Sequence, residues 1–369
     1  MFVVAALQAA APATIVTVSA TTVPAERDLA PVPAAARPGL WRMARTNLAI
    51  GATVFVAWLL LGGDRALQAV ADHWQVSLTM VFGSLVGGGT SEGGGAIAFP
   101  VMTKVLAVPA PEARLFTFAI QSVGMGAATL TIVLNRVPLE WRAIRNGAPW
   151  AVLGVVVSSL ALAPRLDAPS VRLLFTAILV SLALALWISR RCAPDRRDEL
   201  ERVGSKERAA LFGAGLAGGL LSGAAGLGEN TIMFALLVLG FRVCERVVTP
   251  TTVVLLTIVS WAGFATHVFL MSDFTGAVVD MWLAAVPIVA IGAPTGALIC
   301  TRMSRDTIVR ILYALIAVEF VSTLFLVPMS GERAILFGLA IAAFTLICFR
   351  MATGGRCQPT KGRDAGAIP

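Results

Sequence analysis

The chain contains the same unusual segment twice: GSLVGGGTSEGGGAIAFPV at residues 83–101 and GLLSGAAGLGENTIMFALL at residues 219–237. Each copy has a short apolar stretch, a glycine-rich break with one glutamate (Glu92 or Glu229), and a second short apolar stretch. Helix-breaking sequence at membrane depth is tolerated only where it is buried in protein or lines a cavity. An acidic residue at corresponding breaks in two halves therefore indicates the substrate site of a transporter.

The composition is that of a membrane protein. Of the 369 residues, 57% are hydrophobic and only 14% are charged, and the mean hydropathy is +0.83. Several uninterrupted apolar runs approach the roughly 20 residues that a helix needs to cross a bilayer. The net charge of +8 does not indicate nucleic-acid binding, because the arginines lie between apolar runs rather than in one patch.

Length and charged edges predict full crossings and two broken segments. The broken segments, 76–107 and 209–241, contain the glycine-rich breaks. Each is short for two crossings of about 20 residues and long for one, so each is predicted to be a re-entrant hairpin of two half-helices. The full crossings are predicted at 47–63, 114–135, 147–164, 169–189, 247–270, 277–300, 307–328 and 333–349.

The basic residues test this topology. If the first hairpin enters and leaves from outside, every basic cluster falls on the cytoplasmic face, as the positive-inside rule requires. Counting that hairpin as a single crossing would export two of the clusters. The clusters are Arg37, Arg42 and Arg45; Arg136, Arg142 and Arg145; the loop 190–208; Arg302, Arg305 and Arg310; and Arg350, Arg356, Lys361 and Arg363.

Each half is thus predicted to be one hairpin plus three crossings, and this odd count turns the second half upside down relative to the first. The expected fold is an all-α polytopic membrane protein built from inverted repeats. Its segments are an N-terminal extension and linker at 1–46, a first transmembrane helix and outer segment at 47–75, repeat 1 at 76–190, a cytoplasmic basic loop at 191–208, repeat 2 at 209–328, a last helix at 329–350 and a cytoplasmic tail at 351–369. Whether residues 1–24 are ordered, cleaved or spanning stays open.

The cysteines agree with this topology. All fall at or beyond predicted cytoplasmic ends, where thiols stay reduced. They show no CxxC or Cys/His spacing of a zinc site, so neither a metal nor a cofactor is expected. They are Cys192, Cys244, Cys300, Cys348 and Cys357.

The breaks and the segments that follow them resemble the TauE/SafE family of anion transporters, which includes sulfite exporters. After the break this family tends to show E-A-x-x-T-S. Here PEARLFTF supplies Glu112 and Thr117, and CERVVTPTT supplies Glu245 and Thr249. Phe116 and Pro250 depart from the pattern at one hydroxyl position each, and the likeness covers residues 76–328. The resemblance implies a transporter of small sulfur-containing anions rather than an enzyme.

The residues around the breaks suit a compact anion with several acceptor oxygens. Free N–H groups at a helix N-terminus favour an anion, and glycine lets the backbone approach it closely. Hydroxyl side chains would add donors, although in membrane helices they also pack helices together. The expected binding residues are Gly88, Gly89, Thr90, Ser91, Gly93 and Gly94 in the first break, Gly226, Gly228, Asn230 and Thr231 in the second, and Thr117, Gln121, Ser122, Thr249 and Thr252 in the spans that follow.

Glu92 and Glu229 are predicted to couple transport to protons, because an ionised carboxylate at membrane depth is costly. The alternative is that one or both cap a half-helix or pair with an arginine such as Arg114. Lys104 is expected near the outer mouth of the first hairpin, where it would attract anions or snorkel to the interface. Glu319 is a weaker candidate, and His267 is expected to be interfacial.

The sequence therefore predicts a secondary transporter that moves sulfite or an organosulfonate such as sulfoacetate across the bacterial inner membrane. We expect alternating access at a midplane site formed by the two opposed hairpin tips, proton coupling, and both termini in the cytoplasm. The anion and the direction of transport stay open, and a homodimer is compatible with so thin a bundle. The alternatives are a passive anion channel and an intramembrane serine protease using Ser222 and His267, whose serine lacks the rhomboid spacing and needs a base within reach.

Overall fold

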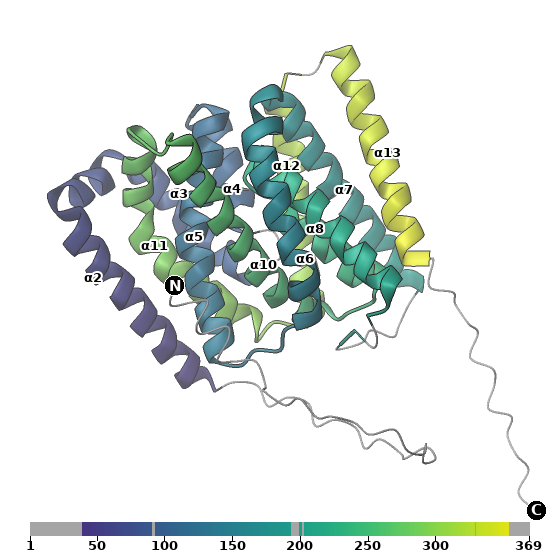
Figure 1. The fold of residues 1–369 in the computed structure, drawn as a ribbon, viewed down its shortest axis with the longest axis horizontal. Helices are drawn as coiled ribbons and strands as arrows, with labels where there is room; N and C mark the ends of the chain where they lie inside the picture. The colour runs from purple at the N-terminus through teal and green to yellow at the C-terminus, as the bar shows by residue number, and fades with distance from the viewer. Residues whose placement is uncertain (1–38, 91–92, 193–198, 201–202, 329, 354–369) are drawn as a thin grey trace, which may run out of the picture.

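The computed structural model describes residues 39–90, 93–192, 199–200, 203–328 and 330–353, which form helices joined by short loops (Figure 1). Within these residues, eight helices are long and apolar enough to cross a membrane. The all-α polytopic fold is thereby confirmed. The eight are α2 (Leu40–Asp72), α5 (Ala110–Leu134), α6 (Trp141–Val157), α7 (Ala168–Cys192), α10 (Glu245–Ala265), α11 (Ala277–Cys300), α12 (Arg305–Leu326) and α13 (Gly331–Thr353).

The first helix is longer than the sequence predicted. α2 begins at Leu40, inside the predicted linker, and a second helical stretch follows the predicted end at residue 63 and reaches Asp72. Gly63 interrupts it with φ 51° and ψ −138°, a conformation that glycine adopts without a Cβ clash. The residues after this kink form the outer segment as a bent continuation of the helix rather than as a loop.

Both broken segments fold back on themselves at their glycines. The first hairpin consists of α3 (Trp74–Gly89), α4 (Gly95–Pro100) and the π-helix η1 (Val101–Val105). The second consists of α8 (Ser205–Ala225), α9 (Glu229–Ala235) and the π-helix η4 (Leu236–Gly240). A Cβ added at Gly87 would lie 2.3 Å from the amide nitrogen of Gly94, and one at Gly218 would lie 2.7 Å from Cα of Glu229. Each break is therefore a sharp turn between two packed limbs.

The longer limb of each hairpin packs in parallel on a helix of the other half of the chain. Along α3 and α11, Ser77 donates to the carbonyl of Ala284 at 2.9 Å. Further along, a Cβ at Gly88 would lie 1.8 Å from the carbonyl oxygen of Ala293. α8 packs on α6 in the same way, since a Cβ at Gly219 would lie 2.1 Å from the carbonyl oxygen of Ala151. Glycine is needed at these contacts because the two backbones touch.

An antiparallel pair, α5 and α10, occupies the centre between the hairpins. Thr129 and Thr257 share a hydrogen bond of 2.7 Å, and Ser260 donates to Gln121 at 2.8 Å. α5 is the helix that follows the first hairpin, and α10 is the helix that follows the second. The corresponding helices of the two halves therefore contact each other. The inversion of one half relative to the other stays a prediction.

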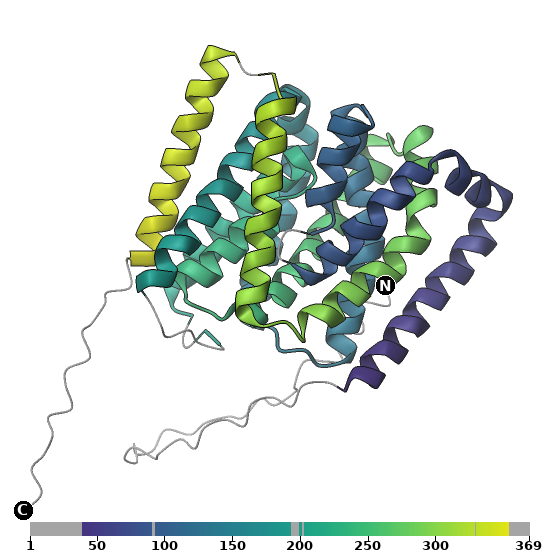
Figure 2. The same ribbon diagram turned by 180° about the vertical axis from the view of Figure 1, so that it is seen from behind.

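The flanking helices carry much of the exposed apolar surface. α2 and α13 lie at opposite edges of the molecule (Figures 1 and 2). Leu61 on α2 is 89% exposed and Ile335 on α13 is 66% exposed. An apolar surface of this extent is stable only in hydrocarbon or against another protein surface, so the fold is that of a multi-pass membrane protein.

Candidate anion-binding site

The two breaks meet at one face of α5. Thr117 and Gln121 are four residues apart and therefore share that face. A Cβ added at Gly95, where α4 begins, would lie 2.5 Å from Nε2 of Gln121 and 2.7 Å from Cγ2 of Thr117. A Cβ at Gly226 in the second break would lie 3.2 Å from Cβ of Thr117. α5 is thus the common wall between the turns of both hairpins.

The tips of the hairpins also face each other directly. Gly93 has φ +72°, and a Cβ on it would lie 3.6 Å from Nε2 of Gln121 and 3.9 Å from Nδ2 of Asn230. Gly93 belongs to the first break and Asn230 to the second, 137 positions later in the chain. The nearest atom to a Cβ on Gly93 would be Cδ2 of Leu256, at 2.5 Å. Two amide side chains and a glycine backbone therefore meet in one closely packed region, and the structure brings these predicted residues together.

Gln121 has a hydrogen-bond donor, Nε2, that faces Gly93 and Gly95. Its Oε1 accepts a hydrogen bond of 2.8 Å from Ser260, which sets the orientation of the amide. Its Nε2 is buried and has no hydrogen-bond partner in the described part of the chain. A buried donor without a partner costs about 1–3 kcal/mol. A ligand with acceptor oxygens would remove that cost.

Two glycines and a serine set the backbone conformation of the second break. Gly226 has φ +81° and Gly228 has φ +131°, both in the region that favours glycine. The amide of Gly228 donates to Oδ1 of Asn230 at 3.2 Å, and the amide of Glu229 donates to Oγ of Ser222 at 2.9 Å. The carbonyl side of the Asn230 amide is thus used within the break, while its Nδ2 faces Gly93.

Glu229 is fully buried, and neither of its carboxyl oxygens has a hydrogen-bond partner among the described residues. Its side chain packs against Gly218, where a Cβ would lie 3.2 Å from Cγ of Glu229. The alternatives of a helix cap or an ion pair with Arg114 are therefore not realised in the described structure. Glu92 and Ser91, the corresponding acidic and hydroxyl residues of the first break, lie outside the described residues.

Some predicted residues of the first break have packing contacts. A Cβ at Gly88 or Gly89 would lie 1.8 Å from the carbonyl oxygen of Ala293 or 3.1 Å from that of Gly296, both on α11. The hydroxyl of Thr90 donates to the carbonyl of Val86 in its own helix. Contact of these residues with a ligand stays a prediction, and the structure shows why glycine is needed there without one.

Gly94 also packs within its own hairpin, where a Cβ would lie 3.3 Å from the carbonyl oxygen of Gly83. A ligand contact at this position stays a prediction as well.

The hydroxyl residues of the following spans differ in their surroundings. Thr117, Ser122 and Thr252 donate to carbonyls of their own helices. Thr231 is fully buried at the start of α9. Thr249 is buried and its Oγ1 has no hydrogen-bond partner in the described structure. Of these, Thr117 is shown beside both breaks, whereas a ligand contact of the others remains a prediction.

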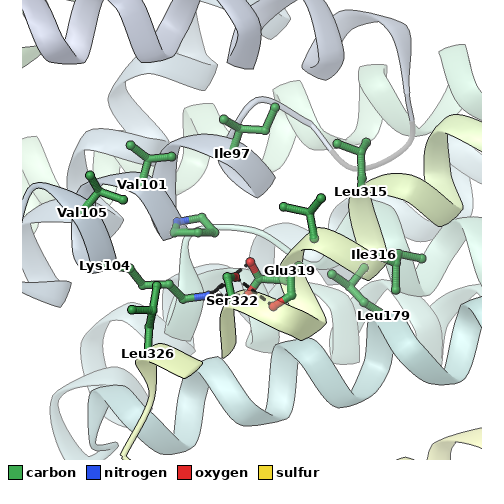
Figure 3. Close-up of a pocket in the computed structure, with 12 residues that line it drawn as sticks. Ile97, Val101, Lys104, Val105, Leu179, Leu315, Ile316, Glu319, Ser322 and Leu326 are labelled. Carbon is green, nitrogen blue, oxygen red and sulfur yellow. Dashed lines mark hydrogen bonds and ion pairs between the residues drawn. The ribbon is translucent and has the colours of Figure 1, made fainter. Parts of the chain in front are cut away.

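Sequence reasoning misjudged the surroundings of Lys104. Its side chain is 2% exposed and forms an ion pair of 3.2 Å with Glu319 of α12 (Figure 3). Lys104 also donates to Ser322 at 2.9 Å and to Thr323 at 3.2 Å. The prediction of a snorkelling side chain is wrong, because the amine is buried and its counter-ion comes from a helix 215 positions later in the chain. The position of Lys104 near the outer mouth of the hairpin stays a prediction.

A pocket lies beside this ion pair, between the short limb of the first hairpin and α12. Its volume is about 250 Å³. Ile97, Val101 and Val105 line one side, and Leu315 and Ile316 line the other (Figure 3). The pocket is separate from the space around Gln121, and its walls are apolar except at the ion pair. It offers no match to a compact anion.

Comparison with known families agrees with the fold and with the breaks. The family model described as sulfite exporter TauE/SafE matches residues 76–326, from the first hairpin to the end of α12. Comparison with curated proteins and with solved structures finds no match for this chain. The family consists of membrane transporters, so the chain is a transporter rather than an enzyme. Since the match spans more than half of the 369 residues, the chain belongs to the TauE/SafE sulfite exporter family.

Proposed function

We propose that this protein is a secondary transporter of sulfite or an organosulfonate such as sulfoacetate in the bacterial inner membrane, with both termini in the cytoplasm. The observation that carries the proposal is the meeting of the two breaks around the unpartnered Nε2 of Gln121. The family supports a sulfur-containing anion as substrate. The site supports a ligand that is compact, rich in acceptor oxygens and small enough for a space lined by glycine.

The donors at this site are mostly neutral. Nε2 of Gln121 and the glycine backbone can bond to oxygens without a charged side chain that would itself need dehydration. Arg114 lies two turns from Gln121 on the same face of α5, and its side chain is 8% exposed. It supplies the positive charge that offsets an anion in a medium of low dielectric constant.

Alternating access follows from two hairpins that share one site. Movement of either hairpin would open the space around Gln121 toward one side while the other hairpin keeps it closed. We propose that Glu229, and Glu92 in the first break, carry the coupling protons. An anion nearby favours the protonated carboxyl, and the coupling is reciprocal, so that proton binding also strengthens anion binding.

The test uses the purified full chain and a panel of sulfite, sulfoacetate, taurine, thiosulfate, sulfate and acetate. Gly95→Ala places a methyl group against Gln121 and Thr117 and should weaken anion binding at least 10-fold. Gly213→Ala is the matched control, because a Cβ at Gly213 meets no atom within 4 Å. Unchanged binding by Gly95→Ala would locate the site elsewhere. Transport that continues in both directions without a response to a pH gradient would identify a passive channel.

A further inference from the structure

Three helices meet around Phe118, near the end of the bundle that holds Asp273 (the Asp273 end). Phe118 on α5 is fully buried, and its ring centroid lies 5.9 Å from that of His267. It shares an apolar cluster with Val155 of α6. A Cβ at Gly263 of α10 would lie 2.7 Å from its ring. Phe118 therefore marks a common level on α5, α6 and α10.

One helical turn beyond this level, each of the three helices presents a buried polar side chain. On α5, the turn leads back to Arg114, because α5 and α10 are antiparallel. α10 continues as the π-helix η5 (Thr266–Met271), which contains His267. α6 continues as the π-helix η2 (Ser158–Leu162), which contacts η5 and begins with Ser158 and Ser159. His267 and both serines have no exposed surface.

The polar atoms at this level lack hydrogen-bond partners within the described chain. They are Nε of Arg114, Nε2 of His267, and Oγ of Ser158 and Ser159. Each buried polar atom of this kind costs about 1–3 kcal/mol when it stays unpaired. Native structures seldom leave several buried polar atoms unpaired in one place, and a single ligand that bonds to all four would explain the arrangement.

His267 is held so that Nε2 is the nitrogen available to a ligand. Its Nδ1 lies 2.9 Å from Oδ2 of Asp273, whose side chain is 41% exposed. The carboxylate accepts the Nδ1 proton and stabilises an imidazolium. Arg114 interacts electrostatically with both His267 and Asp273. η2 carries no titratable residue. Burial of the ring therefore opposes a proton on His267, as does Arg114, whereas Asp273 favours it.

An anion between Arg114 and His267 reverses that opposition. It bonds to Nε–H of Arg114, to the two hydroxyls and, once His267 is protonated, to Nε2–H. We propose that Arg114, His267, Ser158 and Ser159 form a second oxyanion site at the Asp273 end, which takes up one proton, on Nε2 of His267, together with the anion. The inference rests on the proposed function in that the ligand is the same class of sulfur oxyanion.

The second site adjoins the first. A Cβ at Gly226 would lie 3.2 Å from the carbonyl oxygen of Arg114, and one at Gly223 would lie 2.4 Å from Cβ of Ser158. Both glycines belong to the turn region of the second hairpin. An anion bound at the second site would therefore lie next to the site around Gln121. The proton taken up on His267 would be close to that site as well.

The experiment measures anion binding and proton uptake together, by calorimetry of the purified full chain in buffers of different ionisation enthalpy. Thiosulfate and sulfoacetate are the probes, because their charge is constant between pH 5.5 and 8.5. We expect His267→Gln to lower the protons taken up per anion by about one and to flatten the pH dependence of affinity, which such coupling sets at about 5–150-fold. His73→Gln is the matched control, since His73 is the other histidine of the chain and lies at the α2–α3 junction.

Asp273→Asn provides a second test that spares the interior, because Asp273 is partly exposed. Loss of the carboxylate destabilises the imidazolium, so the pH at which proton uptake is half-complete should move downward. Full proton uptake by His267→Gln, or an unmoved midpoint in Asp273→Asn, would overturn the second site while leaving the transporter proposal intact. Absence of binding of any probe by the unmodified protein would instead defeat the proposed function.

Discussion

At the scale of single residues, glycine makes two kinds of close contact in this chain. Gly88 packs against a neighbouring backbone, whereas Gly95 packs against the side chain of Gln121, whose Nε2 has no hydrogen-bond partner among the described residues. The two ends of the Gln121 amide differ likewise, since one end is bonded to Ser260 and the other has no partner in the described chain. The feature that marks the site is thus an unpaired hydrogen-bond donor, Nε2 of Gln121, rather than the residue type alone.

Gln121→Glu should abolish anion binding without unfolding the protein. The substitution keeps an acceptor for Ser260 but replaces the donor Nε2 by a carboxyl oxygen that repels an oxyanion. Loss of one hydrogen bond to a charged ligand, about 1.5–3 kcal/mol, already corresponds to at least a 10-fold loss of affinity. Titration with sulfoacetate measures it. Gln75→Glu on the exposed side of α3 is the control, and equal affinities for the two variants would refute the role of Gln121.

Glu229→Gln should preserve anion binding and remove part of its pH dependence. The amide mimics the protonated carboxyl, so affinity at high pH should rise toward the value that the unmodified protein reaches at low pH. Affinity for thiosulfate measured from pH 5.5 to 8 distinguishes the outcomes. A glutamate with a purely structural role would keep the original pH slope and lower only the thermal unfolding midpoint.

At the scale of elements, each hairpin has a long limb that is fixed and a short limb that is held differently in the two halves. α3 and α8 lie against helix backbones through glycine and have little freedom to slide. In the first hairpin, the short limb is tied to α12 by Lys104 and Glu319. We therefore expect any movement of this hairpin in a transport cycle to involve the short limb and its ion pair.

Lys104→Met should destabilise the protein more than the double variant Lys104→Met/Glu319→Met. Removing one partner leaves a buried charge uncompensated, which costs about 3–5 kcal/mol, whereas replacing both by apolar residues of similar volume is often neutral. Thermal unfolding of the single and double variants in the same detergent gives the comparison. Additive losses in the double variant would show that the two charges do not depend on each other.

At the scale of the whole molecule, the topology is open to a direct chemical test. With Cys192 as the sole cysteine, a membrane-impermeant thiol reagent should react only from the cytoplasmic side. With Asp273→Cys as the sole cysteine, it should react only from outside, because the Asp273 end is predicted to be external. Labelling of both positions from one side would contradict the predicted inversion of the two halves.

The features that sequence reasoning could predict are those encoded locally. Apolar runs and glycine-rich breaks gave the helices and both hairpins, since each depends on neighbouring residues. The surroundings of Lys104 were misjudged because its partner, Glu319, is brought to it only by the fold of the chain. A site shared by the two hairpin tips could be predicted from the duplicated breaks, whereas the contact of Gly93 with Gln121 and Asn230 needed the folded chain.

The π-helix of the second hairpin, η4, carries no charged residue that would correspond to Lys104 of the first. η4 is formed by leucine, valine and glycine and packs on α13. We expect the short limb of the second hairpin to move past apolar neighbours only. Movement of η1, in contrast, would require Lys104 and Glu319 to separate or α12 to move with η1. The movements of the two hairpins would then have unequal energy barriers, and we expect movement of the first hairpin to limit turnover. Pre-steady-state transport currents would show this as one slow phase that the double variant of Lys104 and Glu319 accelerates.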